Sequence, residues 1–383
     1  MTATPTNTPQ HAPEIPPSRS GRFWLPVVAL AALAVLLAGG YVALTRTSND
    51  TKADPATSPA PAALGGVSAA APAGSTAPSA GASASASASA SASAKPSAKA
   101  SKKATATTES GHEHYIPGWP GPNNTGVPAG TKLSTYTGPC TVQKAGTVID
   151  SKTLNCDLTI LAANVTVKRS KINGLVFLDT DRAGSSNWSL TLVDSEVDAG
   201  KQQRAAVSYG NMTLLRDNIH GGVTSAQCGE KSSTCVVQDS YLHGQYLPAT
   251  AVWHLGGFLS NGGHNIRIRH NFILCEPPAN KVGEGCTGDL NLLPDFAVIA
   301  DVIAEDNFLG ANTGSSYCIY GGDASSKPFP HANHIVIRNN TFERGTNGKC
   351  GMYGPVTGFN SNGTGNVWTG NKWQSGGSVA AEN

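Results

Sequence analysis

From about residue 165 onward, the chain repeats one pattern of apolar and small polar positions. The repeat begins with a position that is apolar in six of its eight copies and has an apolar residue two positions later. A small polar residue follows three positions after that, and a final apolar residue two positions further on. Apolar residues spaced by two mark a short strand with one buried face, and a small polar residue suits the turn that follows it. The final apolar positions are Ile172, Val197, Ile219, Leu242, Ile273, Phe308, Phe342 and Trp373.

The length of the repeats predicts the fold class. Early repeats are about 22–25 residues apart and later ones about 31–35, with no helical periodicity between them. Units that bury one face only by stacking on their neighbours are typical of a solenoid. We therefore predict an all-β fold, a parallel β-helix whose final apolar residues stack in one interior file. A β-sandwich with accidental periodicity is the alternative.

The same register makes further predictions about the coils. It places Ile303 at a buried strand position. We expect residues 115–133 to cap the open N-terminal end, because a solenoid has to hide its edge strands. The small polar positions predict a column of turn residues, namely Ser170, Ser195, Asp217, Ser240, Asn271, Asp306, Asn340 and Asn371.

The chain before residue 114 has a different composition. Residues 1–22 are polar and are predicted to be a cytoplasmic tail. The uncharged apolar run in residues 23–45 is long enough to cross a hydrocarbon core of about 30 Å as one transmembrane helix. Cleavage as a signal peptide near Ala38 is the alternative. Residues 46–113 are rich in Ala, Ser and Pro and predict a disordered linker, which leaves residues 114–383 as the folded domain.

All eight cysteines follow residue 139. An even number on one side of the predicted anchor indicates disulfides and places that side outside the cell. A zinc site is the disfavoured alternative, since the chain contains no Cys-x-x-Cys pair. Pairing of sequence neighbours is the simplest connectivity, and it gives Cys140–Cys156, Cys228–Cys235, Cys275–Cys286 and Cys318–Cys350.

Several short motifs in the folded part carry a resemblance. They include Gly118-Trp119-Pro120-Gly121-Pro122, Asp239-Ser240-Tyr241-Leu242-His243, Gly262-Gly263-His264-Asn265-Ile266 and Cys350-Gly351-Met352-Tyr353-Gly354. Through them the domain resembles the actinobacterial exported right-handed parallel β-helix proteins of the pectate-lyase-like superfamily. The resemblance implies work on polysaccharides, which that superfamily divides among lyases, hydrolases, epimerase-like enzymes and non-catalytic binders. A fold alone does not choose among these activities.

Two lengthened repeats carry many of the side chains suited to chemistry. Insertions in a solenoid usually project from one face, often the binding face. Aromatic rings beside hydrogen-bonding groups suit sugars, which stack their apolar faces and hydrogen-bond at their edges. Packing of Trp253 onto its own coil is the alternative. The candidate substrate-binding residues are His220, Tyr246, Trp253, His264 and Arg269.

Asp198, His220 and His243 each follow the final apolar residue of a repeat. Stacking is therefore expected to align them in one column. A structural row is the simpler interpretation. A proton-transfer site is the functional one, because imidazole titrates near neutrality.

Two reactions can be matched to candidate catalytic residues. A lyase needs a base for the proton beside a uronate carboxylate and a cation that neutralises this carboxylate. His243, His254 or His270 could be the base, and Arg267 and Arg269 could be the cation. A hydrolase needs two carboxylates, and two aspartates form the best pair. The Asp-Asp and Gly-His-Gly signatures of polygalacturonase-type hydrolases are absent, which favours the lyase. The candidates are His243, His254, Arg267, His270, Asp289 and Asp295.

The sequence leaves two functions open. One is a membrane-anchored, extracytoplasmic polysaccharide lyase-like enzyme acting on acidic polysaccharide. The other is a non-catalytic polysaccharide-binding or cell-surface structural β-helix. Candidates that line one open groove would favour the enzyme, and candidates that are scattered or buried would favour the binder.

Composition narrows the partners. The net charge is +2 and no basic stripe is present, so nucleic acid is not an expected partner. Calcium is the one cofactor considered, for a lyase, although no cluster of acidic residues supplies its oxygen ligands. The expected partners are polysaccharide and, through the N-terminal helix, the cell membrane. The protein is expected to be a monomer.

Overall fold

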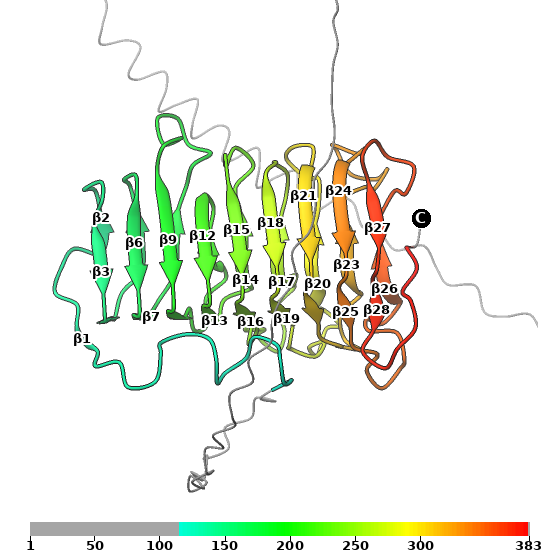
Figure 1. The fold of residues 1–383 in the computed structure, drawn as a ribbon, viewed down its shortest axis with the longest axis horizontal. Helices are drawn as coiled ribbons and strands as arrows, with labels where there is room; N and C mark the ends of the chain where they lie inside the picture. The colour runs from blue at the N-terminus through cyan, green and yellow to red at the C-terminus, as the bar shows by residue number, and fades with distance from the viewer. Residues whose placement is uncertain (1–114, 382–383) are drawn as a thin grey trace, which may run out of the picture. The chain divides into compact units, whose positions relative to one another are not determined.

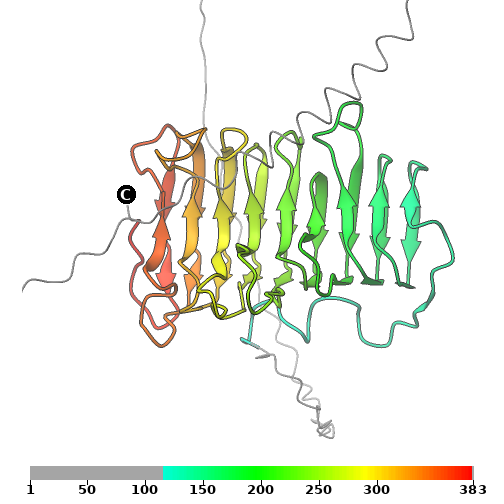
Figure 2. The ribbon, with the colours of Figure 1, turned by 180° about the vertical axis from the view of Figure 1, so that it is seen from behind.

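The computed structural model describes residues 115–381, and every regular element in that range is a β-strand. The strands form three sheets, in which each strand pairs in parallel with the strand three places away in the chain. The chain therefore visits the three sheets in turn, which is the architecture of a parallel β-helix (Figure 1). Seen from behind in Figure 2, the coils follow one another in the same chain order. The predicted all-β parallel solenoid is confirmed.

Sheet C is nearest the viewer in Figure 1. In its strands, alternate residues point inward, as Val167 and Leu192 do, and these two side chains pair and have no exposed surface. Its strands are β3 (Val148–Asp150), β6 (Val165–Lys168), β9 (Ser189–Val193), β12 (Asn211–Leu215), β15 (Cys235–Gln238), β18 (Ile266–Arg269), β21 (Ala300–Glu305), β24 (Asn333–Arg338) and β27 (Val367–Thr369).

Sheet A contains the predicted interior file. Ile172, Val197, Ile219, Leu242 and Ile273 pair in register and are fully buried, so the file is confirmed. Burial of each such side chain contributes roughly 1.5–3 kcal/mol. The strands are β1 (Ser134–Thr135), β4 (Lys152–Leu154), β7 (Lys171–Asn173), β10 (Glu196–Asp198), β13 (Asn218–His220), β16 (Tyr241–Leu242), β19 (Phe272–Ile273), β22 (Phe308–Leu309), β25 (Thr341–Phe342) and β28 (Lys372–Trp373).

Sheet B completes each coil. Gln227, Leu259, Asn291 and Tyr320 pair in register and form one column, in which Leu259 and Tyr320 are partly exposed and Gln227 and Asn291 are buried. Its strands are β2 (Thr141–Val142), β5 (Leu158–Ile160), β8 (Val176–Leu178), β11 (Ala205–Ser208), β14 (Thr224–Cys228), β17 (Leu255–Ser260), β20 (Cys286–Leu292), β23 (Tyr317–Gly321) and β26 (Gly354–Thr357).

One coil is shifted by one residue from the predicted register. The pattern places Phe308 in the interior file, but Leu309 pairs there with Ile273, and Phe308 lies one column outward. Both residues are apolar, so the pattern accepts either register, whereas a shift of one residue exchanges the two faces of a strand. Packing decides between them, because the outward Phe308 ring lies 5.5 Å from the ring of Trp119.

The same shift corrects two more predictions. Asn307, not Asp306, belongs to the polar turn column, since its side chain accepts the hydrogen bond from the preceding coil. Ala304, not Ile303, pairs with Ile268 at the fully buried strand position. The sequence pattern cannot detect this shift, because Asp306 and Asn307 are both polar and Ile303 and Ala304 are both apolar.

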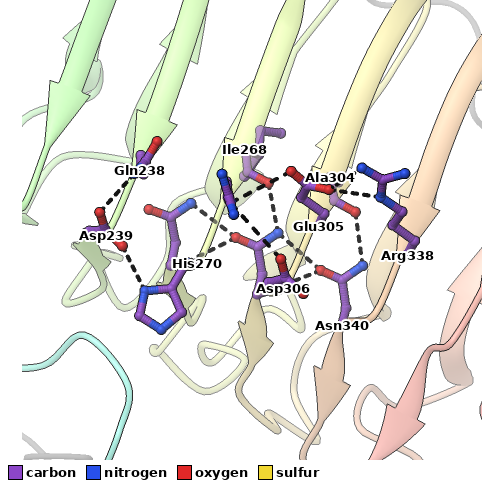
Figure 3. A network of polar contacts seen from close by, with 12 residues as sticks. Gln238, Asp239, Ile268, His270, Ala304, Glu305, Asp306, Arg338 and Asn340 are labelled. Carbon is purple, nitrogen blue, oxygen red and sulfur yellow. Dashed lines mark hydrogen bonds and ion pairs between the residues drawn. The ribbon is translucent and has the colours of Figure 1, made fainter. Parts of the chain in front are cut away.

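Buried polar side chains line the turn from sheet C to sheet A. Asn271 Oδ1 accepts a hydrogen bond from Ser240 N at 2.9 Å, and Asn340 Oδ1 accepts one from Asn307 N at 2.9 Å. Asn340 Nδ2 in turn donates to Ala304 O at 3.0 Å (Figure 3). Such bonds link successive coils and satisfy polar groups that the interior would otherwise exclude. The row comprises Ser170, Ser195, Asp217, Ser240, Asn271, Asn307, Asn340 and Asn371.

The residue before each member of this row bends the chain. The φ angle is 52° at Asp239, 49° at His270 and 54° at Asp306, in the left-handed region that Asn, Asp and His occupy most readily. Since the bend recurs in each coil, these side chains form an outer column in which opposite charges pair. Arg216 Nε lies 2.6 Å from Asp194 Oδ1.

Four disulfides join the predicted sequence neighbours, which confirms the simplest connectivity. They span 16, 7, 11 and 32 residues, and no cysteine within the described residues is free. Fully oxidised cysteines hint at an oxidising, extracellular location.

Residues 115–133, here called the strap, do not cap the open end of the solenoid. Ile116 and Trp119 pack on the outer face of sheet A, and Gly126 N donates a hydrogen bond of 2.9 Å to Arg216 O. Figure 1 shows this cyan segment running along the lower side of the coils. The reason is an outward-facing apolar row that needs cover, formed by Tyr241, Phe272, Leu274 and Phe308.

No helix within residues 115–381 is long and apolar enough to span a membrane. The predicted tail, anchor and linker, at residues 1–22, 23–45 and 46–113, lie outside the described residues.

Candidate functional site

The register of sheet A aligns Asp198, His220 and His243, as the repeat predicts. Asp198 pairs with His220, and His243 follows on the next strand because Ile219 pairs with Leu242. The two imidazole centroids are 5.3 Å apart. The column lies on the outer face of the sheet, beside the row that the strap covers.

His220 lies between two carboxylates. Its Nε2 is 3.3 Å from Glu196 Oε1 and its Nδ1 is 3.7 Å from Asp198 Oδ1. Lys171 Nζ also lies 2.8 Å from Glu196 Oε1. The hydrogen bond from His220, and then those of Lys171, outweigh partial burial and lower the pKa of Glu196 to about 2. Glu196 is therefore ionised at neutral pH and cannot serve as a proton donor there.

His243 is held from three sides. It stacks on Tyr241 with centroids 3.8 Å apart, and its Nε2 lies 2.8 Å from Asn218 Oδ1. Its Nδ1 lies 3.6 Å from Glu276 Oε2. Burial lowers the pKa of His243, which favours the neutral ring at neutral pH. Hydrogen-bonded neighbours on both ring nitrogens fit a structural row better than an open proton-transfer site.

The two lengthened segments project together between sheets A and B. Asn280 Nδ2 donates to Pro248 O at 2.9 Å and to Ala251 O at 2.7 Å, so the second loop holds the first. This arrangement places the candidate residues of the first loop at a rigid projection.

Within the projecting loops, Trp253 and Tyr246 pack against the protein, whereas His254 is exposed to solvent. Trp253 packs on the buried cluster that contains the Cys275–Cys286 disulfide, and its ring lies 6.2 Å from that of Tyr246. His254 exposes 78% of its side chain and lies 3.8 Å from Glu284 Oε2. Trp253 therefore packs on its own coil, which was the alternative to a sugar-binding role for this residue.

The candidate cations lie on the outer face of sheet C. Arg267 Nη2 is 2.9 Å from Asp301 Oδ1, and Arg269 Nε is 3.6 Å from Glu305 Oε1. Their charges are neutralised within the sheet. His264 is exposed in the turn from β17 to β18.

His270 lies at the turn from sheet C to sheet A. Its Nδ1 is 2.7 Å from Asp239 Oδ1, and its ring stacks on Trp119 at 5.4 Å. Figure 3 shows this pairing at one end of the polar network. The position of the His270 side chain is therefore explained by its contacts with Trp119 of the strap and with Asp239 in the preceding coil.

Asp289 and Asp295 do not form an accessible pair of carboxylates. Asp289 is fully buried, its Oδ1 accepts a 2.7 Å hydrogen bond from Cys275 N, and its Oδ2 has no partner among the described residues. Burial raises the pKa of Asp289 well above its ordinary value. Asp295 instead pairs with Lys327 at 2.7 Å.

The candidate catalytic residues are thus scattered over the solenoid. His243 is on the outer face of sheet A, His254 is in the projecting loops, Arg267 is on sheet C and His270 is at the turn between C and A. The structure does not bring these four side chains into one groove.

The structure does assemble a polar pocket that the sequence did not predict. A cavity of about 200 Å³ opens where successive coils turn from sheet B to sheet C. Carboxylates, amides and aromatic rings line it, and Phe296 exposes 66% of its surface. The lining residues are Asp179, Asp181, Tyr209, Gln227, Glu230, Asn261 and Phe296.

Asp181 ties the turns of this acidic pocket together. Its Oδ2 accepts a hydrogen bond from Glu230 N at 2.9 Å, and its Oδ1 accepts one from Lys231 N at 2.6 Å. Asp179 Oδ1 in turn accepts the Asp181 N–H at 3.1 Å. The pocket is therefore preformed by contacts between coils.

The electrostatics of the pocket centre on Glu230. Burial, followed by a hydrogen bond with Asp181, raises the pKa of Glu230 to about 7. Burial also raises the pKa of Tyr209. Glu230 is therefore the group of this pocket that can change its charge near neutral pH.

The sequence pattern gives almost no signal from which this pocket could be predicted. Asp179 and Asp181 stand in the long turn between β8 and β9, which is the one local signal. Glu230 follows 49 residues after Asp181. Asp181 and Glu230 come into contact only because their two turns fold over neighbouring coils, and the periodicity of the sequence does not predict the path of a turn.

A second group, here called the tyrosine cluster, lies on sheet B. The ring of Tyr317 is 5.6 Å from Tyr320 and 5.8 Å from Tyr353, and Tyr353 exposes 62% of its surface. The Cys318–Cys350 disulfide ties the loop before Tyr353 to the strand that carries the other two tyrosines. The cluster is therefore held in place without a ligand.

The pocket and the tyrosine cluster share one face. Gln227 lines the pocket and leads through Leu259 and Asn291 to Tyr320 along the outer column of sheet B. Three strand spacings separate the two ends, which is about 14 Å. An extended polymer can contact both.

Within residues 115–381, one group of three side chains has metal-ligating atoms within 4.8 Å of one another, namely Asp289, Cys318 and Cys350. The two sulfurs are bonded to each other and cannot act as thiolate ligands in this state. A calcium site stays a prediction.

No family model, no curated protein and no solved structure matches this chain. Family membership in the pectate-lyase-like superfamily therefore stays a prediction, while the parallel β-helix architecture rests on the sheets themselves.

Proposed function

We propose that this domain is a non-catalytic polysaccharide-binding β-helix that uses the outer face of sheet B. The observation that carries the proposal is the preformed pocket, in which carboxylates and amides surround Tyr209 and the exposed Phe296. Sugars are held by such sites because rings stack on their apolar faces while polar groups bond their hydroxyls. The tyrosine cluster offers a second stacking surface on the same face.

The scatter of the candidate lyase groups supports binding over cleavage. A lyase needs its base and its cation at one sugar, but His243 and Arg267 lie on different sheets. Arg267 and Arg269 also have acidic partners already. The alternative expected from the sequence, a binder, therefore has the better support.

Hydrolysis in the acidic pocket has less support than binding. Both oxygens of Asp181 already accept backbone N–H groups, those of Glu230 and Lys231. Glycosidases instead hold their two carboxyl groups about 5–5.5 Å apart for retention and about 6.5–9.5 Å apart for inversion. An aspartate that is held by two backbone donors fits a structural or ligand-binding role better than that of a free catalytic carboxylate.

The charge of the pocket selects among sugars. Asp179, Asp181 and Glu230 bring carboxylates to one cavity. Uronate polymers carry the same charge and are repelled, whereas uncharged or amine-bearing sugars are not. We therefore propose a neutral or amine-bearing polysaccharide in place of an acidic one.

The location is part of the same proposal. Disulfides favour the outside of the cell, and residues 23–45 are proposed as the membrane anchor. The right-handed sense of the coil is proposed too, because parallel connections are right-handed in about 98% of known cases.

Binding is tested with the full-length chain on an array of neutral, amine-bearing and uronate glycans. We expect retention by neutral or amine-bearing glycans only. Phe296→Ala and Tyr353→Ala should each weaken binding by about 2- to 10-fold, the worth of one aromatic contact. Val148→Ala, an equally exposed apolar change on sheet C, is the control.

Two results would contradict the proposal. Unsaturated products released from a uronate polymer, detected by their ultraviolet absorbance, would restore the lyase. Retention that is unchanged in Phe296→Ala and Tyr353→Ala would remove sheet B as the binding face.

A further inference from the structure

The strap joins the solenoid in an unexpected place. Trp119 lies against Phe308 on β22, and Gly126 lies against Asn218 on β13, where an added Cβ would meet the Asn218 side chain at 3.0 Å. The strap thus runs along the outer face of sheet A from the later coils toward the earlier ones, passing β22 and then β13 before it reaches β1. The first described residues of the strap therefore lie far along the chain of coils from β1.

Few backbone bonds hold the strap to the body. Among the described residues, the Gly126–Arg216 hydrogen bond is the one backbone bond between the strap and the coils. Its other backbone bonds close turns within the strap, such as those from Asn124 and Thr125 to Gly121 O. Each interior sheet strand, in contrast, is paired on both sides. Segments with few bonds to the rest open at low free energy.

The apolar contacts between the strap and sheet A are concentrated at the N-terminal end of the strap. Ile116 and Trp119 pack on the outward apolar row of sheet A, and Trp119 also stacks on His270. This row forms a cluster separate from the interior core. Loss of the strap therefore leaves the interior files of the solenoid intact.

We propose that the strap is a releasable element: tension on the chain before residue 115 peels residues 115–133 from sheet A as a unit, while the solenoid stays folded. Ile116 and Trp119 carry most of the packing and bear the load first, and the single backbone bond at Gly126 then gives way with them. Release adds about 19 residues, or about 60 Å of extended chain, to the connection. With the anchor proposed at residues 23–45, the strap gives a loaded domain extra reach before its fold is strained.

Hydrogen exchange on the full-length chain tests the mobility of the strap. Amides in residues 115–133 are expected to exchange at least about 10-fold faster than those of the central strands β12 and β15. Trp119→Ala should speed exchange in the strap by about a further 10-fold and leave both strands within about 2-fold of the wild type. Val367→Ala, an exposed change on sheet C, is the control and should alter neither.

Two exchange results overturn the proposal. One is exchange of the strap at the rate of the central strands in the wild type. The other is faster exchange of β12 and β15 in Trp119→Ala, which would make the strap an integral part of the fold.

Pulling on single full-length molecules by their two termini tests the release itself. An early force peak should release about 60 Å of chain before any coil unfolds, and Trp119→Ala should abolish that peak alone. A first release several times longer, in which the strap leaves together with coils, overturns the proposal.

Discussion

At the scale of single residues, the solenoid depends on polar groups that its interior tolerates only when they are paired. Asn271 illustrates this, since its Oδ1 accepts from Ser240 N while its Nδ2 donates to Val237 O at 2.9 Å and to Asn307 Oδ1 at 3.0 Å. One amide thereby connects three coils. Asp289 is the contrasting case, a buried carboxyl with one oxygen unpaired.

Asn271→Ala is expected to lower the free energy of unfolding by about 2–4 kcal/mol, because it leaves Ser240 N and Val237 O buried without partners. Urea unfolding monitored by fluorescence measures the loss. The exposed Asn362→Ala should change stability by less than about 0.5 kcal/mol. Equal effects of the two changes would contradict the role assigned to the polar row.

The raised pKa of Asp289 makes stability depend on pH. The folded state keeps the proton at pH values where the unfolded chain has lost it, so the contribution is full below the ordinary value of 3.8 and is lost as pH rises toward the folded pKa. Asp289→Asn cannot ionise. The stability of the wild type relative to this variant should therefore fall as pH rises above the ordinary value of 3.8, as urea unfolding at several pH values would show, and a constant difference would refute it.

At the scale of elements, two of the disulfides close or anchor long loops. Cys275–Cys286 closes one of the projecting loops, and Cys318–Cys350 ties the loop that carries Tyr353 to β23. Each bond restricts the unfolded chain in proportion to the logarithm of the loop that it closes.

Removal of the two disulfides that differ most in loop length should reveal this dependence. The pair Cys318→Ser and Cys350→Ser opens a separation of 32 residues and should cost about 4 kcal/mol, while Cys228→Ser and Cys235→Ser opens 7 residues and should cost about 2 kcal/mol. All four sulfurs are on fully buried residues, so the substitutions are matched. Equal losses of unfolding free energy would contradict the loop argument.

At the scale of the whole domain, each coil is stabilised by the coils on either side of it. Central strands such as β18 pair with two neighbours, whereas β3 is the last strand of its sheet. Stability in such an array is a sum over neighbouring coils. The same stacking brings the turns of separate coils together around the acidic pocket.

Position in the stack should therefore decide the cost of one and the same substitution. Ile268→Ala in β18 is expected to cost about 3–5 kcal/mol, and Ile149→Ala in β3 about 1–2 kcal/mol less, although both residues are buried in sheet C. Denaturant titrations of the two variants give the comparison. A greater loss at Ile149 would mean that the first coil is the most tightly held.

The amino-acid sequence alone determined the coil and the interior file from Ile172 to Ile273. It also offered neighbour pairing as the simplest arrangement of the cysteines, which the structure confirms. These follow from local information, because alternation along a strand and the order of cysteines can be read without knowing which segments meet. It also placed Asp198, His220 and His243 in one column, since residues at equal repeat positions must stack.

Only the tertiary structure decided the register around Phe308, the course of the strap and the acidic pocket. Adjacent apolar residues allow two registers, and packing against Trp119 selects one. Asp181 and Glu230 belong to irregular turns whose lengths vary from coil to coil, so their contact depends on the path of each turn in space. A repeat predicts what stacks, and it does not predict how the unequal connections between strands fold over one another.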